Sequence, residues 1–224
     1  MALASVLALL LATNLLTNRL APGLYLPTCV VAAAALLLIA RRAGLGWAEL
    51  GLGRAAVRSG LRWALVAFAV VLAAYAVLLA IPAGRAALSD ERAAGLTVGA
   101  LLWYALVRVP FGTVLLEEVA FRGVLWALVR RRKGPVWATG VSSALFGLWH
   151  VLPSTDITRA NAAAADAFGT GGPGRAAAVL AAVVGTAAAG VLLCELRRRS
   201  GSLLAPAGLH TATNSLGYLA AWIH

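Results

Sequence analysis

Two glutamates, two histidines and an asparagine lie within apolar stretches of this chain: Glu117, Glu118, His150, His210 and Asn214. Burying an unpaired carboxylate in the hydrocarbon of a bilayer costs at least about 2.5 kcal/mol, so we expect such a residue to have a function. Hydrolysis of a peptide bond by water needs a base that takes a proton from the water, and donors or a metal that stabilise the oxyanion. Glu117 suits the first task, and the histidines and asparagine suit the second.

Helical spacing orients the two glutamates differently. Adjacent residues of an α-helix point about 100° apart, and Arg122 lies four residues after Glu118 on the same face. We therefore expect a structural pair between Glu118 and Arg122, with Glu117 unpaired and directed toward the interior.

Two further pairs have the same spacing of four residues, Phe146 with His150 and His210 with Asn214. Counted at 1.5 Å per residue from the expected cytoplasmic ends, the depths are about 20 Å for Glu117, about 22 Å for His150, about 12 Å for His210 and about 18 Å for Asn214. With ordinary helix tilt these side chains are expected to meet. Phe146 is expected to pack beside them rather than to react.

Metal binding stays open at this point. Two imidazoles, a carboxylate and an amide oxygen could surround Zn²⁺, with His150 and His210 as ligands. However, the sequence has no HExxH motif, and asparagine is an uncommon zinc ligand. Cys29 and Cys194 lie in apolar stretches and are expected to be buried thiols, without a disulfide framework.

The elements that carry these residues are predicted to be membrane spans. The chain of 224 residues is 62% hydrophobic and 12% charged, more apolar than one soluble core can bury. We predict an all-α, polytopic transmembrane helical bundle of about seven to eight spans of some 20 residues each. The predicted spans are 2–17, 24–40, 61–81, 96–130, 135–151, 176–196 and 202–222. The range 96–130 is too long for one straight span and holds Pro110, so we expect one kinked span, with a separate re-entrant helix as the alternative.

The net charge of +11 suggests nucleic acid until the basic residues are placed against the spans. One set of connectors holds Arg41, Arg42, Arg54, Arg58, Arg62, Arg130, Arg131, Arg132, Lys133, Arg197, Arg198 and Arg199. The opposite connectors hold only Arg19, Arg85, Arg92, Arg159 and Arg175. The positive-inside rule predicts a multi-pass protein of the cell membrane with a cytoplasmic N-terminus, in contact with membrane lipid and not with nucleic acid.

We divide the chain into N-terminal spans with a cytoplasmic connector, residues 1–95, and a core that carries the chemistry, residues 96–224. Within the core, 152–175 is an outer loop rich in alanine and glycine.

Three motifs in the core resemble those of a known family. Glu117-Glu118-Val-Ala-Phe-Arg122, Phe146-Gly-Leu-Trp-His150 and His210-Thr-Ala-Thr-Asn214 resemble the ordered motifs EExxxR, FxxxH and HxxxN of the CAAX-processing and bacteriocin-processing (CPBP) intramembrane proteases, also described as CAAX prenyl protease 2-like or lysostaphin resistance A-like. The resemblance implies an intramembrane endopeptidase in which Glu117 activates water while His150, His210 and Asn214 bind the oxyanion or a metal. Glu118 and Arg122 are then supporting residues. The implied partner is a membrane-associated peptide or protein substrate, prenylated in some members of the family.

Other classes of protein can also bury such residues. A rhomboid-like serine protease is suggested by Gly140-Val-Ser142-Ser143, but the second glycine of its GxSG motif is absent and the glutamates would stay unexplained. A transporter or proton relay would also use buried Glu and His, and a haem protein could use His150 and His210 as ligands. A non-catalytic immunity protein or scaffold is the alternative outside enzymes.

Overall fold

The computed structural model of the chain describes residues 1–90, 93 and 95–223, and these residues form an all-α bundle without a β-strand. The N-terminal part comprises α1 (Ala2–Leu15), η1 (Leu16–Leu20), η2 (Pro22–Leu24), α2 (Tyr25–Arg42), η3 (Arg54–Ala56), α3 (Val57–Ala80) and α4 (Pro82–Leu88). A long helical run follows as α5 (Val98–Trp103), η4 (Tyr104–Val114), α6 (Leu115–Glu117), η5 (Glu118–Leu125) and α7 (Trp126–Trp149). The chain ends with α8 (Ile157–Ala160), α9 (Ala162–Phe168), α10 (Gly172–Ser200) and α11 (Leu204–Trp222).

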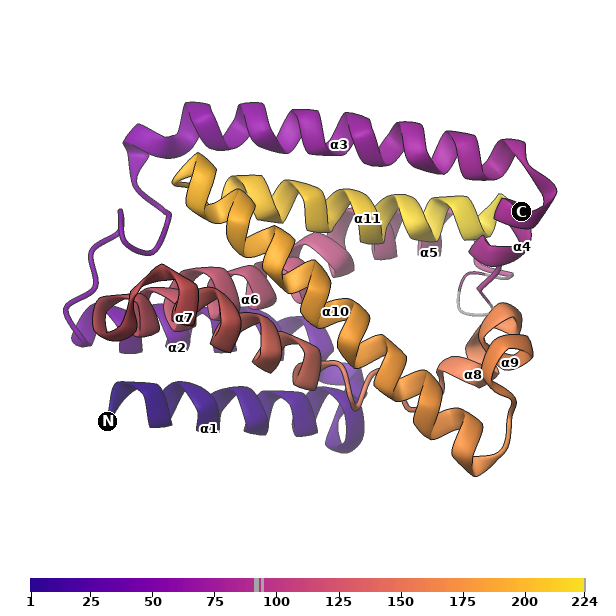
Figure 1. The fold of residues 1–224 in the computed structure, drawn as a ribbon, viewed down its shortest axis with the longest axis horizontal. Helices are drawn as coiled ribbons and strands as arrows, with labels where there is room; N and C mark the ends of the chain where they lie inside the picture. The colour runs from indigo at the N-terminus through magenta and orange to yellow at the C-terminus, as the bar shows by residue number, and fades with distance from the viewer. Residues whose placement is uncertain (91–92, 94, 224) are drawn as a thin grey trace.

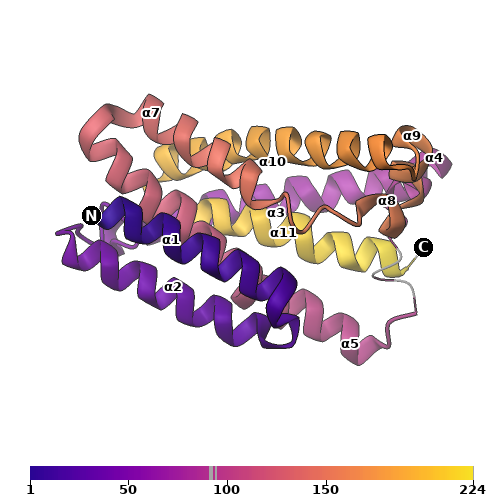
Figure 2. The same ribbon diagram turned by 90° about the horizontal axis from the view of Figure 1, so that it is seen from below.

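The predicted fold class is confirmed, while the number of spans stays a prediction. Five helical ranges among the described residues are long and apolar enough to cross a membrane: Ala2–Leu20, Pro22–Arg42, Arg54–Ala80, Val98–Trp149 and Gly172–Ser200. The fourth range covers most of two predicted spans, 96–130 and 135–151. The chain reverses between them at Gly134, whose φ of 82° is favourable for glycine alone. Figure 2 shows this reversal within α7, at the left of the view. Helix α11 follows the predicted span 202–222 but is not among the five.

The basic connectors gather at one end of the bundle. In Figure 1 the N-terminus, the start of α3, the reversal within α7 and the turn from α10 to α11 all lie at the left end, whereas α4, α8, α9 and the C-terminus lie at the right. The predicted clustering of positive charge on one side therefore agrees with the arrangement of the helices. Arg92 lies outside the described residues, and the cytoplasmic placement of the N-terminus stays a prediction.

The helical run 98–133 is continuous, so the re-entrant helix considered from the sequence is not formed. Its segments η4 and η5 are π-helical, with backbone N–H groups bonded five residues back, as Leu115 N–H is to the carbonyl of Pro110. Pro110 lies inside this wider winding. Such π-helical winding is rare and often found at functional sites.

Small residues allow the helices to approach closely around the middle of the bundle, as is usual between membrane helices. A Cβ added to Gly147 on α7 would lie 2.6 Å from the carbonyl oxygen of Val183 on α10, and one added to Gly190 on α10 would lie 3.0 Å from Cα of Ser143 on α7. Figure 1 shows α10 crossing diagonally from the ends of α3 and α11 toward α8 and α9. The close crossing of α7 and α10 fixes the C-terminal end of α7, where the FxxxH motif lies.

Candidate active site

Glu117, the last residue of α6, is buried at 4% exposure in the middle of the long helical run. Its Oε1 accepts a hydrogen bond of 3.0 Å from the indole Nε1 of Trp149. Its Oε2 is buried and has no hydrogen-bond partner among the described residues. One carboxylate oxygen is thus held in place, and the other has no partner among the described residues.

Both histidines of the motifs face that second oxygen. Nε2 of His210 lies 3.7 Å and Nε2 of His150 lies 4.0 Å from Oε2 of Glu117. These separations exceed hydrogen-bond distance, so the three polar atoms lie near one another without bonding directly.

The opposite ring nitrogens of the two histidines are already engaged. Nδ1 of His150 lies 2.8 Å from the carbonyl oxygen of Phe146, and Nδ1 of His210 lies 2.8 Å from Oε1 of Glu118. A carbonyl and a carboxylate only accept, so each Nδ1 must be the donor. Each Nε2 therefore presents a lone pair when the imidazole is neutral and donates a proton only as an imidazolium.

Glu118 takes part in a buried network beneath Glu117. It pairs with Arg122 at 3.2 Å, as the spacing of four residues predicts, and both side chains are almost fully buried at 2% and 0% exposure. The Arg122 guanidinium lies 3.9 Å from the centre of the Phe146 ring. Glu118 also accepts the bond from His210, a contact that the sequence does not predict.

Phe146 packs, as expected, among the polar groups. Its ring is 3% exposed, and its centre lies 4.7 Å from that of His150 and 6.0 Å from that of His210, both in edge-on arrangements.

Asn214 and His210 differ in their access to the interior space. A cavity of about 660 Å³ is lined by Glu117, Trp149, His150 and Asn214 among others, whereas His210 does not line it. The side chain of Asn214 makes no hydrogen bond to another described residue and is partly exposed to the cavity. The predicted residues are therefore brought together, with His210 behind the surface that a ligand would meet.

Trp149 has a contact with Glu117 that the sequence does not predict. A tryptophan near the end of a span is ordinarily read as an interfacial anchor, but here its indole binds the candidate base. Asn14 of α1 in turn donates to the backbone carbonyl of Trp149 at 2.8 Å. In the sequence, this support of Trp149 is indicated by the polar residues within the first apolar stretch, Thr13, Asn14 and Thr17.

The sequence leaves metal binding open, and the described residues do not form a zinc site as they are arranged. Within the described part of the chain, no group of three or more His, Cys, Asp or Glu side chains is arranged to hold a metal ion. We therefore derive no chemical step through a metal.

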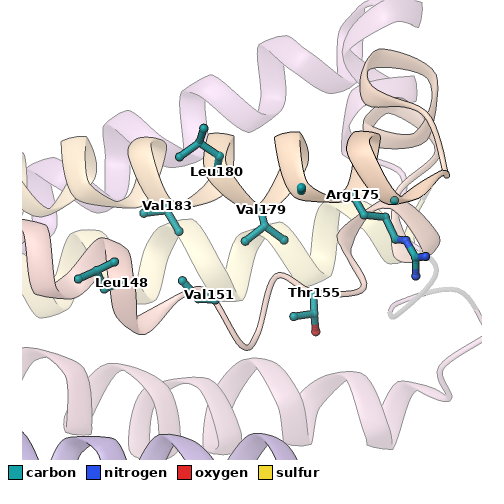
Figure 3. Close-up of a pocket in the computed structure, with 9 residues that line it drawn as sticks. Leu148, Val151, Thr155, Arg175, Val179, Leu180 and Val183 are labelled. Carbon is teal, nitrogen blue, oxygen red and sulfur yellow. The ribbon is translucent and has the colours of Figure 1, made fainter.

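A second hollow lies apart from these residues, between the C-terminal end of α7 and the start of α10. Its volume is about 550 Å³, and Figure 3 shows Leu148 and Val151 facing Val179 and Val183, with Arg175 at one end. None of the predicted site residues lines it. Its wall is mostly apolar and contains no carboxylate or imidazole that could act as a base.

Comparison with known proteins gives one match. A family model described as type II CAAX prenyl endopeptidase Rce1-like matches residues 99–216, which is more than half of the chain and includes all three motifs. No curated protein and no solved structure gives a significant match.

Proposed function

Since the chain belongs to the family of Rce1-like type II CAAX prenyl endopeptidases, we propose that it hydrolyses a peptide bond within the membrane, with Glu117 as the general base. The observation that carries this proposal is the asymmetry of the Glu117 carboxylate. One oxygen is fixed by Trp149, and the other faces two imidazole nitrogens at the wall of a cavity of about 660 Å³. A base held in this way can take a proton from a water molecule bound between it and the substrate.

In the proposed reaction Glu117 removes a proton from water while the oxygen of that water bonds to the carbonyl carbon of the substrate. The carbonyl π electrons move onto its oxygen, and the amide N–H of Asn214 and an imidazolium Nε2–H stabilise the resulting oxyanion. The oxyanion then collapses, the C–N bond breaks, and the proton held by Glu117 passes to the leaving nitrogen. The products are a new carboxylate and a new amine.

Because Nδ1 of each histidine is already bonded, the two histidines can take part in the proposed reaction through Nε2. His150 lines the cavity and can meet the substrate directly, whereas His210 is 7% exposed and faces Glu117 from behind. We therefore assign the oxyanion contact to His150 and Asn214. His210 then lies behind the carboxylate of Glu117, with Nε2 3.7 Å from Oε2, and is itself held by the Glu118–Arg122 pair.

The substrate proposed is a membrane-associated peptide or protein. The family description names a prenyl endopeptidase, which makes a prenylated target the first to test. We keep residues 96–224 as the proposed core, with a cytoplasmic N-terminus, and note that residues 1–95 also contribute Asn14 to the support of Trp149.

The proposal is tested by proteomic comparison of membranes from cells that produce the wild-type chain, Glu117→Ala or Glu117→Gln. We expect truncated membrane proteins with the wild type and intact ones with both variants. Equal cleavage in all three samples would exclude Glu117 as the base, and absence of cleavage in all three would favour the non-catalytic alternative. A separate assay after chelation tests the metal route, because loss of activity that zinc restores would establish a metalloprotease.

A further inference from the structure

Arg108 lies on the wall of the same cavity as Glu117. It is partly buried, on η4, at a position where the sequence suggests only an arginine at the membrane interface. No carboxylate among the described residues forms an ion pair with it. The cavity therefore has a permanent positive charge on its wall in addition to the carboxylates of Glu117 and Asp90.

The guanidinium of Arg108 is held by aromatic rings rather than by acids. It lies 4.1 Å from the ring centre of Tyr25 on α2 and 5.3 Å from that of Tyr104, one turn earlier on its own helix. Such cation–π contacts stabilise the charge while leaving its N–H groups available to an anion.

Tyr25 is itself fixed in place. Its hydroxyl forms a hydrogen bond of 2.9 Å with Thr113, and a Cβ added to Gly112 would lie only 2.9 Å from Cε1 of its ring. Glycine at this position lets the ring pack against the helix backbone. Arg108 is therefore positioned in advance, which lowers the entropy cost of binding a ligand.

The π-helical winding allows Arg108 and Glu117 to lie on the wall of the same cavity. Residues nine apart are separated by roughly 2.5 turns of an α-helix and would face opposite sides. The wider turns of η4, which extends from Tyr104 to Val114, change this relation, and both side chains line the cavity. Their separation along the helix is at most about 13 Å at 1.5 Å per residue.

This separation matches a short length of substrate. Three to four extended residues span roughly 10 to 14 Å. If the scissile carbonyl of a bound peptide lies at Glu117, the residue three or four positions further along that peptide therefore lies near Arg108. Arginine binds a carboxylate through two parallel N–H bonds. At its C-terminal end an unmodified peptide carries an α-carboxylate.

We propose that Arg108 binds the C-terminal carboxylate of the substrate and thereby fixes the position of the chain end relative to the scissile bond. This inference rests on the proposed function and assigns a specificity-determining residue to it. Hydrolysis adds OH to the scissile carbonyl carbon and H to the leaving nitrogen. The released peptide then keeps its original carboxylate at Arg108.

The test uses one fluorescent peptide with a farnesylated cysteine followed by three aliphatic residues, prepared as a C-terminal acid and as the amide. The purified full chain should cleave the acid with a kcat/KM about 10- to 100-fold above that of the amide, in the range expected for hydrogen bonds to a charged group. Arg108→Gln should lower cleavage of the acid by the same factor, mainly through KM, and leave that of the amide unchanged. Arg108→Lys should retain part of the preference.

Arg175→Gln is the matched control, because Arg175 lines the separate hollow of Figure 3, and it should keep the full preference for the acid. Equal cleavage of acid and amide by the wild type would overturn the inference. So would an equal loss for both peptides in Arg108→Gln, or a lost preference in the control.

Binding of the two peptides to Glu117→Gln, followed by fluorescence anisotropy, separates this inference from the proposed function. If the acid binds more tightly and Arg108→Gln removes the difference, Arg108 recognises the carboxylate even if the wild type cleaves neither peptide, and only the proposed function fails. If acid and amide bind equally, the inference fails whatever the activity.

Discussion

The indole Nε1 of Trp149 donates a hydrogen bond of 3.0 Å to Oε1 of Glu117, joining the end of α7 to the middle of the long helical run. A carboxylate inside a membrane protein needs such a donor, because an unsatisfied buried acceptor costs about 1–3 kcal/mol. The bond also leaves Oε2 as the carboxylate oxygen without a partner among the described residues. We therefore regard Trp149 as a positioning residue for the proposed base.

Trp149→Phe tests this role. Phenylalanine keeps an aromatic ring near Phe121, whose ring centre lies 5.9 Å from that of Trp149, but it removes the N–H. We expect kcat to fall about 10-fold or more, as for a lost hydrogen bond to a charged group, and the stability to fall by no more than the about 1–3 kcal/mol that one unsatisfied buried acceptor costs. Trp137→Phe is the control, because Trp137 is 64% exposed. Equal kcat values for Trp149→Phe and wild type would show that the indole N–H does not assist Glu117.

For the Glu118–Arg122 pair, we expect that removal of the arginine lowers stability. Arg122→Ala leaves the carboxylate of Glu118 buried without its cation, and breaking a buried pair in this way typically costs about 3–5 kcal/mol. We expect a clearly lower thermal midpoint in detergent. Arg159→Ala removes an ion pair whose arginine is 69% exposed and should change the midpoint little. Similar midpoints for the two variants would contradict the structural role of Arg122.

Because α7 packs closely against α10, we expect two glycines of α7 to differ in how much their substitution by alanine changes stability. Gly147→Ala places a methyl group 2.6 Å from the carbonyl oxygen of Val183, and overpacking of this kind costs about 1–3 kcal/mol. Gly140→Ala meets no atom within 4 Å and should be neutral or slightly stabilising, because alanine favours a helix. Thermal unfolding of both variants checks this, and a Gly147→Ala protein as stable as Gly140→Ala would show that the two helices do not pack so closely.

In the connector between α2 and η3, the hydrogen bonds of Glu49 should make stability depend on pH. Hydrogen bonds from Arg131, of 2.8 and 2.7 Å, and from the backbone N–H of Gly46 hold the pKa of Glu49 below its usual range. A lowered pKa in the folded state means that this stabilisation is complete above the unfolded pKa and is lost as the pH falls through the folded pKa. The small difference in thermal midpoint between wild type and Glu49→Gln should therefore shrink between about pH 7 and pH 3. A difference that grows as the pH falls would contradict this account.

Much of this arrangement follows from the sequence, because it depends on local spacing and hydrophobicity. Apolar composition predicts the all-α membrane bundle, and the spacing of four residues predicts the Glu118–Arg122 pair that the structure shows. The cluster of glycine and proline at Gly134 marks the reversal between two predicted spans. Equal depth of the motifs predicts that Glu117 and His150 approach one another.

The remaining features depend on geometry that periodicity does not describe. Helix α7 ends at Trp149, so the direction of that indole is set by the end of the helix and by Asn14 rather than by a helical face. Arg108 reaches the cavity through π-helical winding, whereas an analysis based on 3.6 residues per turn places it opposite Glu117. The bond from His210 to Glu118 joins two helices and has no local signal in the sequence.

The most direct test of the central claim compares the adjacent variants Glu117→Gln and Glu118→Gln in one purified preparation, measuring the peptide cleavage rate and the thermal midpoint of each. In Glu117→Gln the side-chain amide keeps an oxygen for the Trp149 bond but cannot take a proton, so this variant should lose activity by about 100- to 10,000-fold while its midpoint stays near that of the wild type. Glu118→Gln should lower the midpoint, because Arg122 loses its buried partner. A Glu117→Gln protein that is folded and cleaves the peptide at the wild-type rate would contradict the claim that Glu117 is the base.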